Sequence, residues 1–327
     1  MNDRAHTVSD ATVDGFPVVV LGSPGDSLEA AFAPGVGMVG CSLRHRGEEL
    51  LGQRGGLAAY AERGSSFGIP LLHPWANRLG EPRYRAPRSA DVVELDFERM
   101  PLRQDEHGLP IHGVLAASPH WEVVGAEPAD GSARLEARLD FGANPELLAA
   151  FPFPHELRIA AELAGTALTI TTELTATGVV PVPVSFGWHP YLTLPGAPRA
   201  AWLVELAARH RALLDRHGIP TGETEPAPFT IGPLGDRAFD DLFPELSEPA
   251  RFTASGGGRR IAVELVSGYP VAQVYSPADA DFVCFEPMTA PTNALVTGDA
   301  LPLVEPGATF AAVFRVAVED LPDEGER

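Results

Sequence analysis

The feature that most constrains the fold is a repeated alternation of apolar and polar side chains along the chain. Every second residue is apolar in segment 134–141, and the same pattern returns in segments 157–163 and 168–174. Alternation with a period of two is typical of strands that bury one face. Gly165 and Thr166 separate the last two runs and predict a hairpin.

Glycine (33 residues) and proline (32 residues) are spread along the whole chain, which favours many short strands joined by turns over long helices. Segment 260–266 alternates directly after three glycines, 256–258, which we interpret as a hairpin tip. A phosphate-binding loop would need a strand before it and a helix after it. Segment 202–214 also alternates in part, but residue propensity predicts a helix there.

The chain has 327 residues, and its composition is typical of a globular protein. We expect a single domain (1–327, core 16–318) without internal repeats. A formal charge of −20 argues against nucleic-acid and membrane-surface partners. No apolar run reaches the roughly 20 residues of a membrane span, and no signal peptide is visible. Cys41 and Cys284 form neither a disulfide framework nor a metal knuckle. These features predict a cytoplasmic protein.

Two segments place hydrogen-bonding groups after apolar runs. Segment 68–78 ends in Asn77 and Arg78, which offer many donors and one amide acceptor and so suit a polyhydroxylated ligand. Segment 108–113 carries His112 before Gly113, where a glycine allows a close approach to the backbone. The alternatives are a surface turn with a solvated Arg78 and a structural His112.

Segment 184–191 surrounds His189 with aromatic residues, including Trp188 and Tyr191. Pro190 restricts His189 to an extended backbone. An imidazole that titrates near neutrality, beside rings that stack on a sugar, suits proton transfer on a carbohydrate. A buried aromatic cluster with a structural histidine is the alternative.

Glu286 ends the apolar run that begins at residue 282. A carboxylate in apolar surroundings is costly unless it is paired or functional. Desolvation raises the pKa of a carboxyl group and makes it a stronger base. A structural salt bridge would also account for Glu286.

In this order the four segments resemble the aldose 1-epimerases (galactose mutarotases). Segment 219–223, Ile-Pro-Thr-Gly-Glu, resembles that family's Pro-x-Gly turn, and segment 239–243, Phe-Asp-Asp-Leu-Phe, resembles its Asp-x-x-Phe element. The resemblance covers roughly residues 16 to 318, which is nearly the whole chain.

The resemblance implies an all-β fold, a β-supersandwich of mostly antiparallel strands, in which segment 202–214 is strand rather than helix. It also implies a role for each matching residue. Glu286 corresponds to the general base that removes the anomeric hydroxyl proton, and His189 to the general acid that protonates the ring oxygen. Arg78, His112 and Asp240 correspond to residues that hold sugar hydroxyls, although Asp241 is adjacent and sequence does not settle which aspartate faces the cleft. We add Asn77, Trp188 and Tyr191 as substrate-binding residues.

The same chemistry follows from the reaction itself. Interconversion of α and β anomers opens the hemiacetal, rotates about C1–C2 and closes the ring, so it needs one group to take the O1 proton and another to protonate O5. We therefore expect no metal, nucleotide or redox cofactor. The expected partner is a small sugar, and the expected assembly is a monomer or homodimer.

Two other functions stay open. One is an epimerase for a phosphorylated or modified sugar, for which Arg83, Arg85 and Arg88 are candidate phosphate ligands or, alternatively, solvated loop charges. The other is a carbohydrate-binding protein without turnover, although a pure binder needs no acid–base pair.

Overall fold

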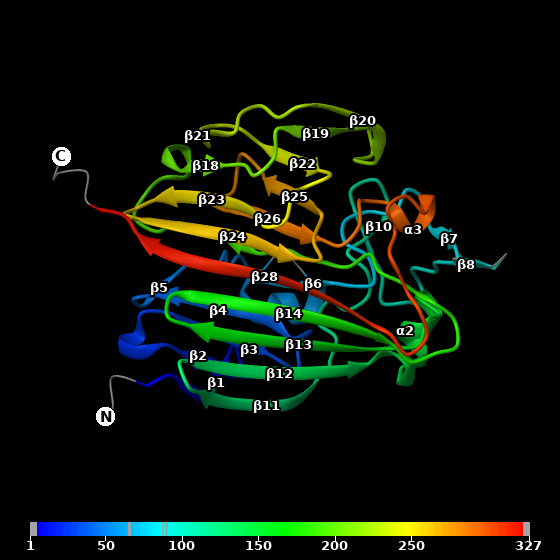
Figure 1. The fold of residues 1–327 in the computed structure, drawn as a ribbon, viewed down its shortest axis with the longest axis horizontal. Coiled ribbons are helices and arrows are strands. Elements are labelled where there is room, and N and C mark those ends of the chain that lie inside the picture. Colours follow the sequence, from blue (N-terminus) through cyan, green and yellow to red (C-terminus); the bar gives the residue numbers. More distant parts are fainter. Residues whose placement is uncertain (1–4, 65–66, 87, 89–90, 323–327) are drawn as a thin grey trace.

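The largest layer of the structure is a nine-stranded antiparallel sheet. The computed structural model describes residues 5–64, 67–86, 88 and 91–322, and this sheet crosses the front of the molecule in Figure 1. In spatial order its strands are β11 (Glu122–Ala129), β12 (Ser132–Asp140), β13 (His155–Ala164), β14 (Ala167–Ala176), β28 (Thr309–Asp320), β24 (Arg259–Ser267), β23 (Ala250–Gly256), β18 (Leu203–Glu205) and β21 (Ile231–Pro233).

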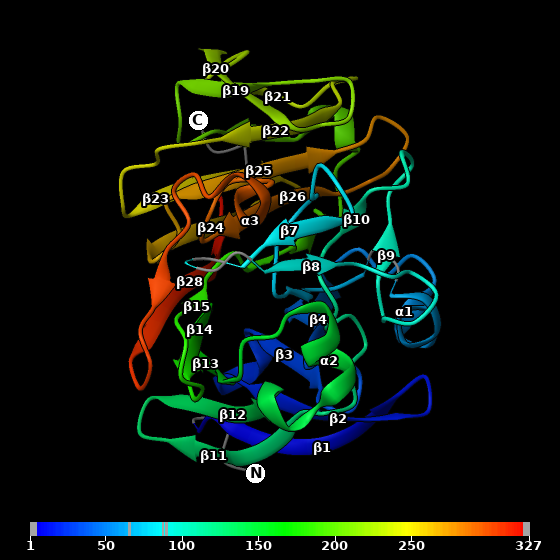
Figure 2. The same cartoon turned by 90° about the vertical axis from the view of Figure 1, so that its right-hand side faces the viewer.

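A five-stranded antiparallel sheet lies behind one half of the first sheet. Its strands are β1 (Thr7–Val13), β2 (Phe16–Gly22), β3 (Glu29–Ala33), β4 (Val39–His45) and β5 (Glu48–Glu49). Strands β1 and β2 contact β11 and β12, and both views place these four strands together at one end of the molecule (Figures 1 and 2). Buried side chains from both sheets, among them Phe32, Leu157 and Phe314, belong to one apolar cluster.

A six-stranded antiparallel sheet carries Tyr191, Asp240 and Glu286. It consists of β22 (Phe239–Phe243), β25 (Val271–Ser276), β26 (Val283–Met288), β16 (Gly187–Trp188) and β6 (Leu71–Leu72), with β17 (Tyr191–Leu192) paired to β26. Four two-stranded ribbons complete the strands: β7 (Arg83–Arg85) with β8 (Val92–Glu94), β9 (Arg103–Gln104) with β10 (Pro110–Ile111), β15 (Val182–Pro183) with β27 (Leu303–Val304), and β19 (His210–Leu214) with β20 (Pro220–Pro226).

Helices are short and lie between strands. They are α1 (Gly56–Arg63), α2 (Pro145–Ala150), α3 (Ala294–Thr297) and the 3₁₀ turns Pro24–Asp26, Phe141–Ala143 and Arg199–Ala201. Every pairing between two of the named strands is antiparallel. The predicted all-β sandwich is therefore confirmed. Within the described part of the chain, no helix has the length and apolar character to cross a membrane.

The alternating segments form strands that bury their apolar side chains on one face, as the alternation predicts. Along β13 and β14 the apolar residues face the core, and Leu163 pairs with Leu168 across the turn at Gly165. The predicted hairpin is confirmed. The glycine-rich hairpin is confirmed as well, because β23 and β24 are joined by Gly257 and Gly258, both with positive φ.

The helix that propensity predicts over 202–214 is wrong. The segment forms β18 and β19, joined by residues 206–209. Trp202 and Val204 bury their side chains, whereas Leu203 and Glu205 are exposed, as alternation requires. Val204 pairs with Ala254 of β23 and Gly232 of β21, so pairing on both sides overrides a weak local helix preference. The strand implied by the resemblance is confirmed.

Candidate active site

One pocket of about 310 Å³ gathers all the predicted site residues except Trp188. It lies where β22, β25 and β26 meet the β9–β10 ribbon with its connecting turn and the segment that follows β6. The predicted residues that line it are Asn77, Arg78, His112, His189, Tyr191, Asp240 and Glu286. Five segments that are far apart in the sequence therefore contribute predicted residues to one cavity.

His189 and Glu286 meet in this pocket. Gly187 of β16 pairs with Met288 of β26, and this pairing brings the two side chains together, with Nε2 3.2 Å from Oε1. Both side chains are almost fully buried. The contact allows one proton to move between the carboxyl and imidazole groups.

Burial disfavours the charged form of both partners. It raises the pKa of Glu286 well above its usual value, and Asp240 adds to this effect while Arg78 opposes it. Burial also lowers the pKa of His189 to about 3, an effect that the backbone of His189 opposes and the charge of Arg103 reinforces. Burial therefore favours the proton on Glu286, which leaves a neutral imidazole beside a neutral carboxylic acid.

Arg78 is buried with three carboxylates around its guanidinium. Nε donates to Asp105 Oδ2 at 2.8 Å, Nη2 donates to Glu106 Oε1 at 3.3 Å, and Nη1 lies 3.5 Å from Asp240 Oδ2. Nη1 also donates to Asn77 Oδ1 at 3.2 Å. Burial opposes the charge of Arg78, but the carboxylates outweigh it and raise the pKa of the guanidinium. Arg78 is thus a fixed cation whose position depends on its neighbours.

The structure resolves the choice between the two adjacent aspartates. Asp240 lines the pocket, and its Oδ1 accepts a 2.6 Å hydrogen bond from Gln273 Nε2. Asp241 points to the other side of β22, where its carboxylate accepts two bonds from Arg211 Nη1 at 2.9 and 3.0 Å. Side chains alternate along a strand, so only one of the two can face the cavity.

Rings hold the histidines of the pocket in place. Tyr191 stacks on His189 with ring centroids 4.2 Å apart and planes 11° apart, and its hydroxyl lies 3.3 Å from Nε2. His112 meets His189 edge to face at 5.5 Å, and Tyr275 does so at 5.9 Å. The pKa of His112 is lowered well below its usual value, chiefly by burial and further by His189 and Arg103.

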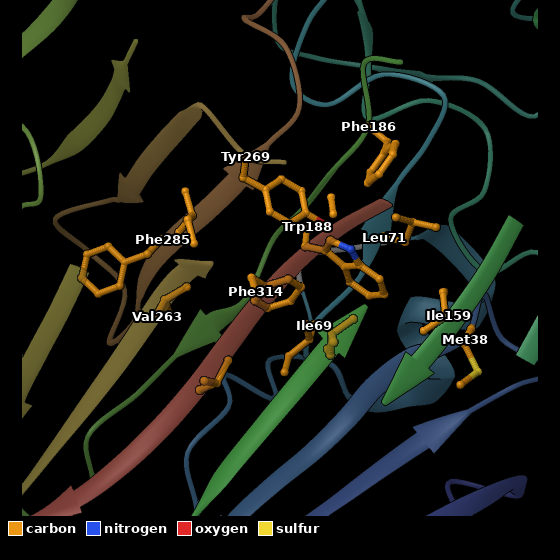
Figure 3. Packing of buried hydrophobic residues seen from close by; sticks show 14 of the residues in the cluster. Met38, Ile69, Leu71, Ile159, Phe186, Trp188, Val263, Tyr269, Phe285 and Phe314 are labelled. Carbon is orange, nitrogen blue, oxygen red and sulfur yellow. The ribbon is translucent and has the colours of Figure 1, made fainter. Parts of the chain in front are cut away.

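The prediction that Trp188 binds substrate is wrong. Its side chain is fully buried in the apolar core, where Nε1 donates to Thr172 Oγ1 at 3.0 Å and the ring lies 5.7 Å from that of Phe314. Figure 3 shows Trp188 among Phe314, Tyr269 and Leu71. Neighbouring residues of an extended segment face opposite sides, so when His189 faces the pocket Trp188 faces the core.

Several pocket residues escaped the sequence analysis. They are Arg103, Gln104, Asp105, Glu106, Ile111, Gln273 and Tyr275. Gln273 pairs with Glu286 across β25 and β26, a register that sequence alone does not reveal. The available signal was the polar Gln273 within the otherwise apolar segment 271–274.

The three arginines considered as phosphate ligands lie outside this pocket. Arg83 donates to Glu81 at 2.8 Å, Arg88 donates to Glu305 at 2.8 Å, and Arg85 is exposed on β7. Cys41 and Cys284 are buried free thiols. Among the residues that the structure describes, no group of three or more His, Cys, Asp or Glu side chains is arranged to hold a metal ion.

The fold and this pocket define a β-sandwich protein with an acid–base pair and hydrogen-bonding groups for a polar ligand. The family named Aldose 1-epimerase matches residues 41–317, so the chain belongs to the aldose 1-epimerase family. Membership makes it a carbohydrate epimerase by class.

Individual relatives are distant. The chain is 25% identical over 264 residues to the protein YihR of Escherichia coli (strain K12). The aligned residues cover 76% of this chain and 80% of YihR. A galactose mutarotase-like protein of Clostridium acetobutylicum superposes with a TM-score of 0.81 at 18% identity, covering 97% of this chain and 99% of the other. Galactose 1-epimerase of Lactobacillus acidophilus NCFM gives 0.76 at 15% identity, covering 97% and 99%. At these identities the two solved structures show a shared fold.

Proposed function

We propose that this protein is a mutarotase that interconverts the α and β anomers of a free aldose. The observation that carries the proposal is the contact between His189 and Glu286 in an open pocket that is lined with hydrogen-bonding groups. O1 and O5 of an aldose are both bonded to C1, so one neighbouring acid–base pair can reach both oxygens.

In the forward direction Glu286 takes the O1 proton while His189 gives a proton to O5, which breaks the C1–O5 bond and leaves the open-chain aldehyde. Rotation about C1–C2 presents the other face of the carbonyl to the C5 hydroxyl. Ring closure then returns both protons with the two roles exchanged. No proton or electron is gained or lost overall.

These roles require the ionised form of the pair, with the proton on His189. Burial favours the neutral form of the pair, so a bound sugar must stabilise the charged form. A sugar hydroxyl that donates to the Glu286 carboxylate does this, because a hydrogen bond to the charged form lowers the pKa of a carboxyl group. The neutral form would carry out the same exchange with the two residues in reversed roles.

The remaining pocket groups suit the other hydroxyls. Asp240 and the exposed Glu106 offer carboxylate acceptors, and Arg78 and Gln273 offer donors. Acceptors and donors that alternate around one cavity match hydroxyl groups, which both give and take hydrogen bonds.

Polarimetry of freshly dissolved α-glucose, α-galactose and other aldoses, with catalytic amounts of protein, tests the proposal. The optical rotation of at least one aldose should reach its equilibrium value faster than in buffer alone. Binding of these sugars without any acceleration would favour the non-catalytic carbohydrate-binding function instead.

One observation favours a second candidate, an epimerase for an anionic sugar. Arg103 lines the same pocket, and no carboxylate of the described residues lies within salt-bridge distance of it. Its positive charge reaches both His112 and His189. A phosphate or carboxylate on the sugar would pair with this guanidinium.

A phosphosugar and a uronic acid, assayed beside the neutral aldoses, distinguish the two candidates. If the substrate is anionic, Arg103→Gln should reduce turnover of the charged sugar much more than turnover of the neutral one. An equal effect on both would leave the neutral aldose as the proposed substrate.

A further inference from the structure

A six-residue pattern, Asp-x-His-Gly-(Leu or Ile)-Pro, occurs twice in this chain, once at each of two hairpin tips. Segment 105–110 reads Asp-Glu-His-Gly-Leu-Pro, and segment 215–220 reads Asp-Arg-His-Gly-Ile-Pro. The first copy joins β9 to β10, and the second joins β19 to β20.

The two copies fold alike. In the first, Asp105 Oδ1 accepts from the backbone N–H groups of His107 and Leu109, both at 2.8 Å. In the second, Asp215 Oδ1 accepts from the N–H groups of residues 217 and 219 at 2.8 and 3.0 Å. Gly108 and Gly218 close the turns with φ values of 76° and 74°, a conformation that favours glycine.

The two tips meet each other and enclose Arg78. The rings of His107 and His217 lie 5.2 Å apart at 64°. The first tip holds the guanidinium through Asp105 and Glu106, at the distances given above. The second tip contacts Arg78 through its backbone at Gly218. A Cβ on Gly218 would lie 3.1 Å from Arg78 Nη1 and 3.4 Å from Cζ.

The close approach distinguishes the two glycines. A Cβ on Gly108 would meet no described atom within 4 Å. Turn geometry alone therefore accounts for the glycine at 108, whereas at 218 the position of Arg78 adds a second constraint.

The β19–β20 hairpin is also tied to β22, because Arg211 of β19 binds Asp241, the neighbour of pocket residue Asp240.

We propose that the tip formed by residues 215–218 positions Arg78 for substrate, with Gly218 and His217 as the positioning residues. The paired tips act as a clamp on the guanidinium: one supplies carboxylates and the other closes against it. The inference rests on the proposed function only in that Arg78 is taken to bind a sugar hydroxyl.

The main test compares Gly218→Ala with Gly222→Ala. Both glycines lie in the same hairpin with positive φ, but a Cβ at 222 would meet none of the described atoms within 4 Å. Displacing Arg78 should weaken a hydrogen bond from a charged donor, so Gly218→Ala should raise KM roughly tenfold and change kcat little. Gly222→Ala should leave both near wild type. Equal effects of the two variants would overturn the proposal.

A double-mutant cycle shows whether Gly218 acts through Arg78. In an Arg78→Gln background, adding Gly218→Ala should raise KM no further, because the group that it displaces is gone. Additive effects of the two substitutions would contradict a positioning role.

His217 provides a test that does not depend on the folding of the glycine variant. His217→Ala removes the ring contact with His107 and should raise KM a few-fold, on the order of a lost weak contact. His217→Phe restores a ring and should return KM towards the wild-type value. Failure of the phenylalanine variant to rescue would remove His217 from the clamp.

The N–H signal of Arg78 Nε in a nitrogen–proton NMR spectrum separates this proposal from the proposed function, since it needs no turnover. Gly218→Ala should shift or broaden the signal, and Gly222→Ala should not. If the wild-type protein accelerates no aldose, the proposed function fails, and this signal still decides whether the tip positions Arg78. An unchanged signal in Gly218→Ala would overturn the clamp.

Discussion

Two buried histidines precede proline in similar local sequences, but their surroundings differ. His73 stands in Leu-His-Pro-Trp, and His189 stands in Trp-His-Pro-Tyr. Each lies within a cluster of rings and contacts a second histidine, His155 for the first and His112 for the second.

The His73–His155 pair is enclosed by the core. Nε2 of one ring lies 2.9 Å from Nε2 of the other, and His155 Nδ1 donates to the carbonyl of Phe153 at 2.6 Å. Phe141 stacks on His155 with centroids 4.3 Å apart. Burial lowers the pKa of His155 to about 4. Neither His73 nor His155 is among the residues that line the pocket.

The His112–His189 pair lines the pocket and has a carboxyl group beside it. Burial lowers the pKa of both pairs, so neither burial nor a perturbed pKa distinguishes a structural histidine from a functional one. Access to a cavity and the neighbouring Glu286 make the difference. The comparison shows that the role of a histidine among aromatic residues, structural or functional, can be assigned only when its neighbouring groups are known.

The largest effect is expected from Glu286→Gln, which removes the carboxyl group that distinguishes the pocket pair. Loss of one positioned acid–base group typically costs roughly 10²–10⁴-fold in rate. Turnover should fall by that amount while sugar binding is kept, because glutamine has nearly the same shape. Rate and binding are measured by polarimetry and calorimetry.

Glu264→Gln serves as the matched control for that variant. Glu264 lies on the outer side of β24, where it binds Arg251, and its loss should leave the rate near wild type. Wild-type kinetics in Glu286→Gln would remove this residue from the mechanism.

Acid should lower the free energy of unfolding, because the buried His73–His155 pair takes up protons more readily in the unfolded chain. His155 has a pKa of about 4 when folded and about 6.5 when unfolded. Between these values the unfolded chain binds more protons, so stability is full above pH 6.5 and falls as the pH drops towards 4. Each such histidine contributes roughly 1.4 kcal/mol per pH unit.

Urea unfolding at pH 7, 5.5 and 4.5 measures this dependence. His155→Phe removes one titrating ring from the enclosed pair but keeps an aromatic side chain beside Phe141. The variant should lose stability less steeply with falling pH than the wild type does. An identical slope in both proteins would show that His155 does not titrate on unfolding.

Trp188→Phe sharpens the contrast between two neighbours in the sequence. It removes the bond to Thr172 Oγ1 and some core volume, so stability should fall by roughly 1–3 kcal/mol. KM for the sugar should stay unchanged, since Trp188 does not line the pocket. A raised KM with normal stability would restore Trp188 as a substrate ligand.

The smallest effect is expected from removal of metal ions. No cluster of metal-ligating side chains occurs in the described ranges of the chain, and the proposed proton transfers need only Glu286 and His189. Mutarotation should survive exhaustive dialysis against EDTA. Activity that is lost on dialysis and restored by a divalent cation would contradict a cofactor-free reaction.

The sequence predicted features that depend on local pattern. Alternation identified β12, β13 and β14, and glycines identified the turns at Gly165 and Gly257. The pattern failed over residues 202–214, because pairing of β18 on both sides overrode local propensity.

The site could be predicted where one segment carried a recognisable residue, as with Glu286 and His189. It could not be predicted where strand pairing places the residue, as for Gln273 opposite Glu286. Trp188 failed for a related reason: its orientation depends on which face of the strand meets the core.

The central claim is that His189 acts in the reaction whereas His155, in the enclosed His73–His155 pair, acts only in the fold. The most direct test measures melting temperature and mutarotation rate on the same preparations of His189→Asn and His155→Asn. We predict that His189→Asn keeps its melting temperature but loses orders of magnitude in rate, because asparagine forms hydrogen bonds but cannot deliver a proton. His155→Asn should melt at a lower temperature and keep its rate per folded molecule. A destabilised but fully active His189→Asn would contradict the account.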